Sequence, residues 1–153
     1  MTKKKRYLFR EAYRLKSQKL VVVIDSQGGG LGKAIVEKIK KSDLGVRVLG
    51  IGTNTVATMA MLKAGADDAV TGENAVLYNA QFADYIIGGL GIIAANSMLG
   101  EISPAMANAI SSSRAVKLLI PVNKCNLYVV GTQENGLGEK IDEALARIQI
   151  DGD

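Results

Sequence analysis

Histidine and tryptophan are absent from this chain of 153 residues, and cysteine occurs once. Without histidine the chain lacks Ser-His-Asp and Cys-His nucleophile pairs, zinc sites that need imidazole, and the commonest general base. A single cysteine excludes an internal disulfide and agrees with a reducing compartment. Any catalysis must therefore use Asp, Glu, Lys, Tyr or the one Cys.

Proline and long apolar runs are also scarce. Two prolines argue against long disordered linkers. The longest weakly polar run, residues 85–99, is too short to span a bilayer and is interrupted by glycines. No apolar core of sufficient length follows the basic N-terminus, so we expect no signal peptide. These absences predict a cytoplasmic protein that is not an integral membrane protein, with one domain over residues 20–150.

Positive charge is concentrated at one end of the chain. Residues 1–20 hold eight Lys or Arg and one Glu, whereas the other 133 residues hold eleven basic and fourteen acidic residues. A domain that binds nucleic acid by sequence normally carries basic residues across a folded face, so we expect no such binding. The arm at residues 1–19 has three open interpretations: an amphipathic helix docked on the domain or a neighbouring subunit, which we favour, a frayed tail, or a surface for anionic lipid or RNA.

The stretch at residues 20–33, LVVVIDSQGGGLGK, is the most informative in the chain. An apolar, β-branched run leads into a turn with four glycines, and a segment with apolar residues at helical spacing follows. This pattern predicts a buried strand, a glycine turn and a helix. Glycines allow backbone N–H groups to approach a ligand closely, and a helix N-terminus favours an anion. The alternative is a tight turn that only packs the helix on the sheet.

Two known phosphate-binding patterns match this stretch only in part. The dinucleotide pattern G-x-G-x-x-G, started at Gly28, requires glycine where Lys33 stands and a later carboxylate that the segment GIGTNT does not provide. The P-loop pattern matches at Gly32 and Lys33, but Ala34 replaces the hydroxyl that binds magnesium. The stretch therefore predicts a binding site without naming a reaction, a cofactor or a metal.

Strands and helices are expected to alternate along the whole domain. The patterns predict an α/β, single-domain, three-layer Rossmann-like fold with a mostly parallel sheet of five to six strands. The sixth strand is expected at residues 127–131, antiparallel at the edge. Thr53 or Thr55 is expected to cap one helix, and Ser103 with Pro104 to begin another.

Polar residues recur where each expected strand ends. In an open parallel sheet, ligands bind beyond the carboxyl ends of the strands. Recurring Asn, Thr and Gly at these exits therefore predict one composite pocket, although turns also recruit Asn and Gly for positive φ alone. The candidate ligand-binding residues are Gln27, Gly28, Gly29, Gly30, Gly32, Lys33, Thr53, Asn54, Asn74, Asn96 and Asn123. Asp25 and Glu73 are the candidate catalytic bases, and Glu101 is a further acidic candidate.

These residues support three hypotheses. The leading one is binding of a phosphate-bearing small molecule or nucleotide at the glycine loop. The second is an enzyme without histidine, with Asp25 or Glu73 as base and Lys33 or Lys124 for electrostatic stabilisation. The third is an interaction module in which the apolar loop GLGIIAANSML pairs with itself, and we expect a homo-oligomer.

Five segments in this order resemble a bacterial family of small proteins of unknown function. They are DSQGGGLGKAIVEKI, GTNTVATMAMLKAGAD, TGENA, NSMLGEISPAMANAI and LLIPVNKCN, and they fall within residues 20–131. The resemblance implies a Rossmann-like domain and no established activity. Two features depart from the family: Ser26 stands where members have glycine, and most members begin close to the first strand without a basic arm.

Overall fold

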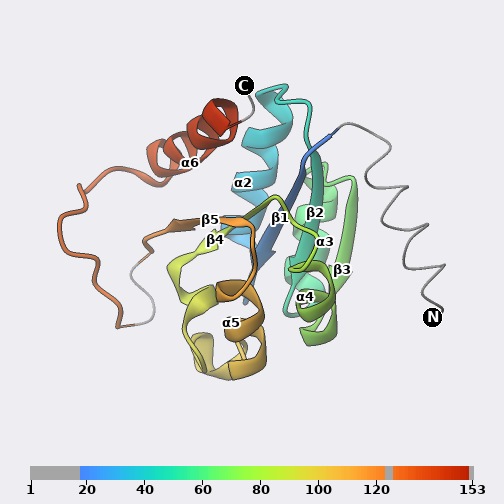
Figure 1. Ribbon diagram of the computed structural model, residues 1–153, viewed down its shortest axis with the longest axis vertical. Helices are drawn as coiled ribbons and strands as arrows, with labels where there is room; N and C mark the ends of the chain where they lie inside the picture. The colour runs from blue at the N-terminus through green and yellow to red at the C-terminus, as the bar shows by residue number, and fades with distance from the viewer. Residues whose placement is uncertain (1–17, 123–125, 152–153) are drawn as a thin grey trace.

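The computed structural model describes residues 18–122 and 126–151, which fold as alternating strands and helices (Figure 1). The elements in chain order are β1 (Leu20–Asp25), α2 (Gly30–Lys41), β2 (Arg47–Gly52), α3 (Thr55–Lys63), β3 (Asp68–Thr71), α4 (Glu73–Asn79), β4 (Tyr85–Gly89), the 3₁₀ turns η1 (Leu90–Ile93) and η2 (Met98–Gly100), α5 (Pro104–Ser111), β5 (Val116–Ile120) and α6 (Leu137–Asp151). The predicted strand, glycine turn and helix are thus β1, the loop at residues 26–29 and α2.

The five strands form one parallel sheet in the order β3-β2-β1-β4-β5. In the central strand, Val21 lies opposite Val48 of β2 and Tyr85 of β4. Every residue of β1 is buried, because the strand has a neighbour on each side and helices on both faces. The Rossmann-like α/β fold predicted from the sequence is confirmed, with five strands.

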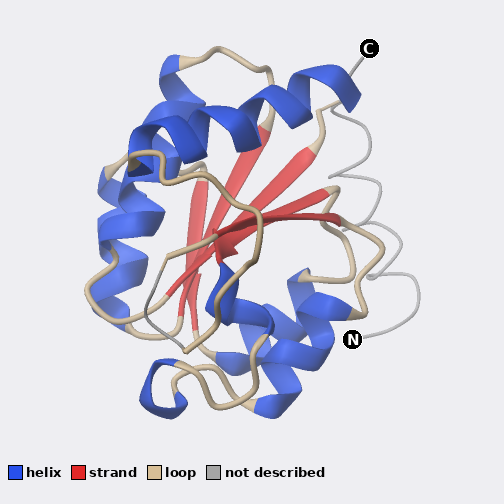
Figure 2. Ribbon diagram, turned by 90° about the vertical axis from the view of Figure 1, so that its left-hand side faces the viewer, coloured by secondary structure: helices blue, strands red, loops and turns tan. Residues whose placement is uncertain are grey.

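Helices cover both faces of the sheet (Figure 2). Val21 and Val23 point to the face that packs against α2, α3 and α6, whereas Val22 and Ile24 point to the face that packs against α4 and α5. This alternation follows from the two-residue period of a strand. Burial on both faces explains why β1 is a continuous apolar run, with no polar residue until Asp25.

Of the two predicted helix caps, that of α5 is confirmed and that of α3 is not. The hydroxyl of Ser103 accepts a hydrogen bond from the Met106 N–H at 3.1 Å, as expected for the cap of α5. The predicted cap of α3 by Thr53 or Thr55 is wrong. Asn54 caps α3, because this residue is the extended one before the first helical turn and its side-chain oxygen accepts from the Ala57 N–H at 3.0 Å.

The predicted sixth strand is absent from the described part of the chain. Residues 126–136 contain no strand, and Tyr128 and Val130 are 82% and 87% exposed. A strand needs a hydrogen-bonded partner, and none of the described segments pairs with this one. The helix expected in the N-terminal arm falls on residues 1–17, which lie outside the described part of the chain.

Candidate functional site

The strand order reverses between β1 and β4. From β1 the chain builds outward through β2 to β3, and then returns to place β4 on the other side of β1. In open parallel sheets, ligands bind at such a point, beyond the carboxyl ends of the strands. The loop at residues 26–29 leaves β1 there and leads directly into α2.

Asp25 holds this loop together. Asp25 is 8% exposed, and its Oδ1 accepts a hydrogen bond from the Ser26 N–H at 2.8 Å. Its Oδ2 accepts from the Gly32 N–H in the first turn of α2 at 2.6 Å. These two bonds join the end of β1 to the start of α2, so the geometry gives Asp25 an anchoring role.

Two of the four glycines in the loop and the first turn of α2 are required by the protein itself. Gly29 has a φ of 75°, and a Cβ there would lie 2.7 Å from the Cα of Ala57 on α3. A Cβ at Gly32 would lie 2.8 Å from the Cβ of Asp25 and from the sulfur of Met61. Gly29 therefore allows α2 to approach α3, and Gly32 allows Asp25 to reach its backbone partner.

The other two glycines have no such requirement. No atom of the described residues lies within 4 Å of a Cβ built on Gly28 or Gly30, and neither φ is in the left-handed region. Among the described residues, the N–H groups of Gly28, Gly30 and Leu31 have no protein acceptor. The end of the loop and the first two residues of α2 thus present three backbone donors, with open space beside Gly28 and Gly30.

Glu101 joins the ends of β1 and β2. Its Oε2 accepts hydrogen bonds from the Gln27 N–H at 2.8 Å, from the Asn54 side-chain amide at 3.3 Å and from the Thr53 hydroxyl. Asn54 also donates to the Gln27 carbonyl oxygen at 3.0 Å. Gln27 has a φ of 51°, so this contact holds a residue in the left-handed region.

These contacts keep the Glu101 side chain charged. Partial burial raises the pKa of this carboxyl, but the hydrogen bond from Gln27 and those from the two side chains after β2 outweigh it. The net pKa lies below the ordinary value for glutamate. A charged carboxylate, held in place by hydrogen bonds, therefore lies between the ends of β1 and β2.

The candidate base Glu73 lies one step further along the same edge. Its carboxylate accepts a hydrogen bond from the hydroxyl of Ser103, which also caps α5. This contact connects the start of α4, after β3, with the segment that carries Glu101. The structure thus brings together Gln27, Thr53, Asn54 and the exits of β1 and β2, with Glu73 linked through Ser103.

No side-chain hydrogen bond joins the described candidates Lys33, Asn74 and Asn96 to this group. The Lys33 ammonium is 3.9 Å from the Glu37 carboxylate, on an exposed side of α2. Asn74 is exposed at the start of α4, and Asn96 is exposed in the loop before η2 with a φ of 63°. Asn123 lies outside the described residues. Glu101 takes the central place, which the sequence does not reveal because its partner Gln27 is 74 positions away.

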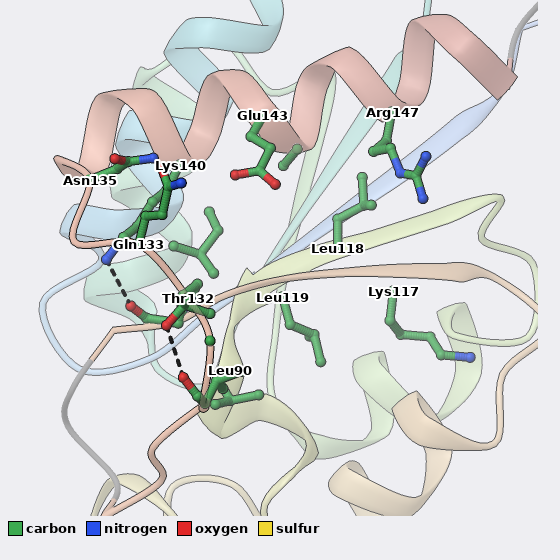
Figure 3. A pocket seen from close by; sticks show the side chains of 15 residues that line it. Leu90, Lys117, Leu118, Leu119, Thr132, Gln133, Asn135, Lys140, Glu143 and Arg147 are labelled. Carbon is green, nitrogen blue, oxygen red and sulfur yellow. Dashed lines mark hydrogen bonds between the residues drawn. The ribbon is translucent and has the colours of Figure 1, made fainter.

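A cavity of about 840 Å³ lies elsewhere, beside the open edge of β5 and under α6 (Figure 3). Glu143 and Arg147 project into it from α6, and Lys117 borders it on β5. Its two lysines are engaged with backbone: Lys117 donates to the Ser113 carbonyl at 2.7 Å and Lys140 to the Pro121 carbonyl at 3.3 Å. None of the candidate ligand-binding or catalytic residues that the structure describes lines this cavity.

Within the described residues there is no group of three or more metal-binding side chains. No helix among those same residues is long and apolar enough to cross a membrane.

The family described as "Domain of unknown function (DUF3842)" matches residues 20–151. The chain belongs to this family. No curated protein matches the sequence of this DUF3842 chain. Its fold is similar to a solved structure, the dodecameric FMN-dependent Ubix-like decarboxylase from Escherichia coli O157:H7, with a TM-score of 0.43 and 17% identity over 86% of this chain and 76% of that chain.

Proposed function

We propose that the chain binds the phosphate group of a small molecule or nucleotide at the loop between β1 and α2. The observation that carries this proposal is the pair Gly28 and Gly30. Neither crowding nor backbone conformation requires glycine at these positions, yet a side chain on either would stand in the open space beside the exposed N–H groups. Close approach of a ligand to the backbone explains both glycines.

The N-terminus of α2 favours an anion at this place. The first turn of α2 carries no acidic residue, and its N-terminus adds a partial positive charge to the N–H groups of Gly30 and Leu31. Asp25 already uses the N–H of Gly32. The phosphate is therefore expected over the first part of the loop, at Gly28, Gly30 and Leu31, with backbone donors in place of the Lys33 ammonium.

The substitution Gly30→Val tests the site. The added side chain blocks access to the N–H groups but does not clash with neighbouring residues. Binding is therefore expected to be lost in a protein that stays folded. Gly136→Val is the matched control, because Gly136 also has open space and an ordinary φ but lies just before α6.

Two measurements read out the effect. Native mass spectrometry of freshly purified protein, followed by denaturation, weighs any bound small molecule. NMR titration of ¹⁵N-labelled protein with inorganic phosphate follows the backbone amides of Gly28, Gly30 and Leu31. Shifts at these amides in wild type and Gly136→Val, absent in Gly30→Val, support the proposal. Unchanged affinity in Gly30→Val, or no shifts in the wild type, would contradict it.

The proposal includes a cytoplasmic location and a homo-oligomer, both from the sequence. Catalysis is not part of it, because the first candidate base, Asp25, accepts backbone hydrogen bonds at both oxygens.

A further inference from the structure

The two oxygens of the Glu101 carboxylate have different surroundings. Oε2 accepts from Gln27, Thr53 and Asn54, and these bonds set the position of the group. Oε1 receives no hydrogen bond from any residue that the structure describes. The contacts that join the loops after β1 and β2 use only one oxygen of the carboxylate. The second oxygen is therefore able to accept a hydrogen bond from a ligand.

This carboxylate lies where we expect the ribose of a nucleotide whose phosphate is bound at the glycine turn. Gln27, which donates to Glu101, directly precedes the proposed phosphate donor Gly28, and Thr53 and Asn54 directly follow β2. In Rossmann-type sheets, a phosphate on the turn after the first strand places the attached ribose beside the end of the second strand. The sequence has no carboxylate after β2, but the fold supplies one from the segment between β4 and α5.

We infer that Oε1 of Glu101 accepts hydrogen bonds from the vicinal ribose hydroxyls of a ribosyl phosphate, which makes a ribonucleotide the substrate class of this site. The inference rests on the proposed phosphate site, because the phosphate sets where the sugar lies. An ionised carboxylate accepts hydrogen bonds only, and hydroxyl pairs are donors that fit it.

The test compares three probes on the wild-type protein by ¹⁵N NMR titration: inorganic phosphate, ribose 5-phosphate and 2-deoxyribose 5-phosphate. The inference predicts that ribose 5-phosphate binds about ten-fold or more tightly than its 2-deoxy counterpart, as expected for a hydrogen bond to a charged group. This comparison needs no variant and is independent of any effect on folding.

The variant Glu101→Gln then assigns the preference to one residue. The three donors that bind Oε2 in the wild type are expected to bind the amide oxygen of the glutamine, so that its NH₂ group faces the ligand. The preference for ribose 5-phosphate over 2-deoxyribose 5-phosphate is then expected to fall to within about three-fold. Its affinity for inorganic phosphate is expected to stay equal or rise, because a nearby negative charge is removed. Glu139→Gln, a change of the same type at an exposed residue in the first turn of α6, is expected to keep the wild-type preference.

The outcomes separate the two proposals. If inorganic phosphate shifts the loop amides but the two sugar phosphates bind equally, the ribose inference is overturned and the phosphate site stands. A preference that survives in Glu101→Gln also overturns it. If none of the three probes shifts Gly28, Gly30 or Leu31, both proposals fail together.

Discussion

Asp25 and Glu101 are carboxylates beside the same turn, but they serve different partners. Asp25 is buried and uses both oxygens on backbone N–H groups of its own loop and helix. Glu101 comes from a distant segment and uses one oxygen on the exits of β1 and β2. The first side chain shapes the loop, whereas the second leaves an acceptor beside it.

The glycines of the loop at residues 26–29 are expected to differ in their effect on stability. Gly29→Ala should lower the free energy of unfolding by about 2–4 kcal/mol, because the new Cβ meets the backbone of Ala57 and the residue has a positive φ. Gly28→Ala should change it by less than about 0.5 kcal/mol, because its surroundings are open. Urea denaturation followed by circular dichroism measures both. Equal losses in the two variants would show that Gly28 is also a packing residue.

At the scale of elements, one side chain joins α2 to two strands at the edge opposite the site. Asp67 stands just before β3 and accepts hydrogen bonds from the Lys40 ammonium at 2.7 Å and from the Val48 N–H at 2.8 Å. Partial burial raises the pKa of Asp67, but these hydrogen bonds and the charge of Lys40 outweigh it. The pKa therefore lies below the ordinary aspartate value of 3.8.

This contact predicts a pH dependence of stability. Because the pKa is lowered in the folded state, the contribution of Asp67 is fully present above the ordinary pKa and is lost as the pH falls through the folded value. Asp67→Asn should therefore cost up to about 1 kcal/mol near neutral pH, a value limited by solvent screening, and progressively less below about pH 4. Urea denaturation at several pH values measures the difference. If the difference in free energy of unfolding between wild type and Asp67→Asn grew as the pH fell, the predicted stabilising role of the Asp67 carboxylate would be wrong.

At the scale of the whole molecule, parallel strands gather their exits at one edge, and the segment that carries Glu101 to this edge also exposes apolar groups. Leu99 is fully exposed at the tip of η2, and Ile93 in the same loop is 36% exposed. Exposed apolar groups on a loop often mark a contact between proteins.

We therefore expect the purified chain to form a homo-oligomer through this loop. Light scattering after size-exclusion chromatography should give a multiple of the monomer mass, and Leu99→Ser should shift the mass toward the monomer. Val130→Ser, at another exposed apolar position, should leave the mass unchanged. A monomeric wild type at micromolar concentration would contradict this prediction.

Local patterns were enough to predict most elements of the fold. The apolar run at residues 20–24 and the glycine turn after it indicated a central buried strand and a βα unit, and Ser103 with Pro104 marked the start of α5. The predicted sixth strand is an exception with a physical cause. Residues 127–131 have the composition of a strand, but composition does not supply a partner strand.

The sequence by itself determined the class of the fold and the edge of the sheet at which a site would lie, because hydrophobic period and glycine position are local properties. It did not distinguish the glycines needed for packing, Gly29 and Gly32, from Gly28 and Gly30, which face open space. Only the tertiary structure decided that Glu101 stands between β1 and β2. That contact joins residues 74 positions apart, and only the folded sheet brings them to the same edge.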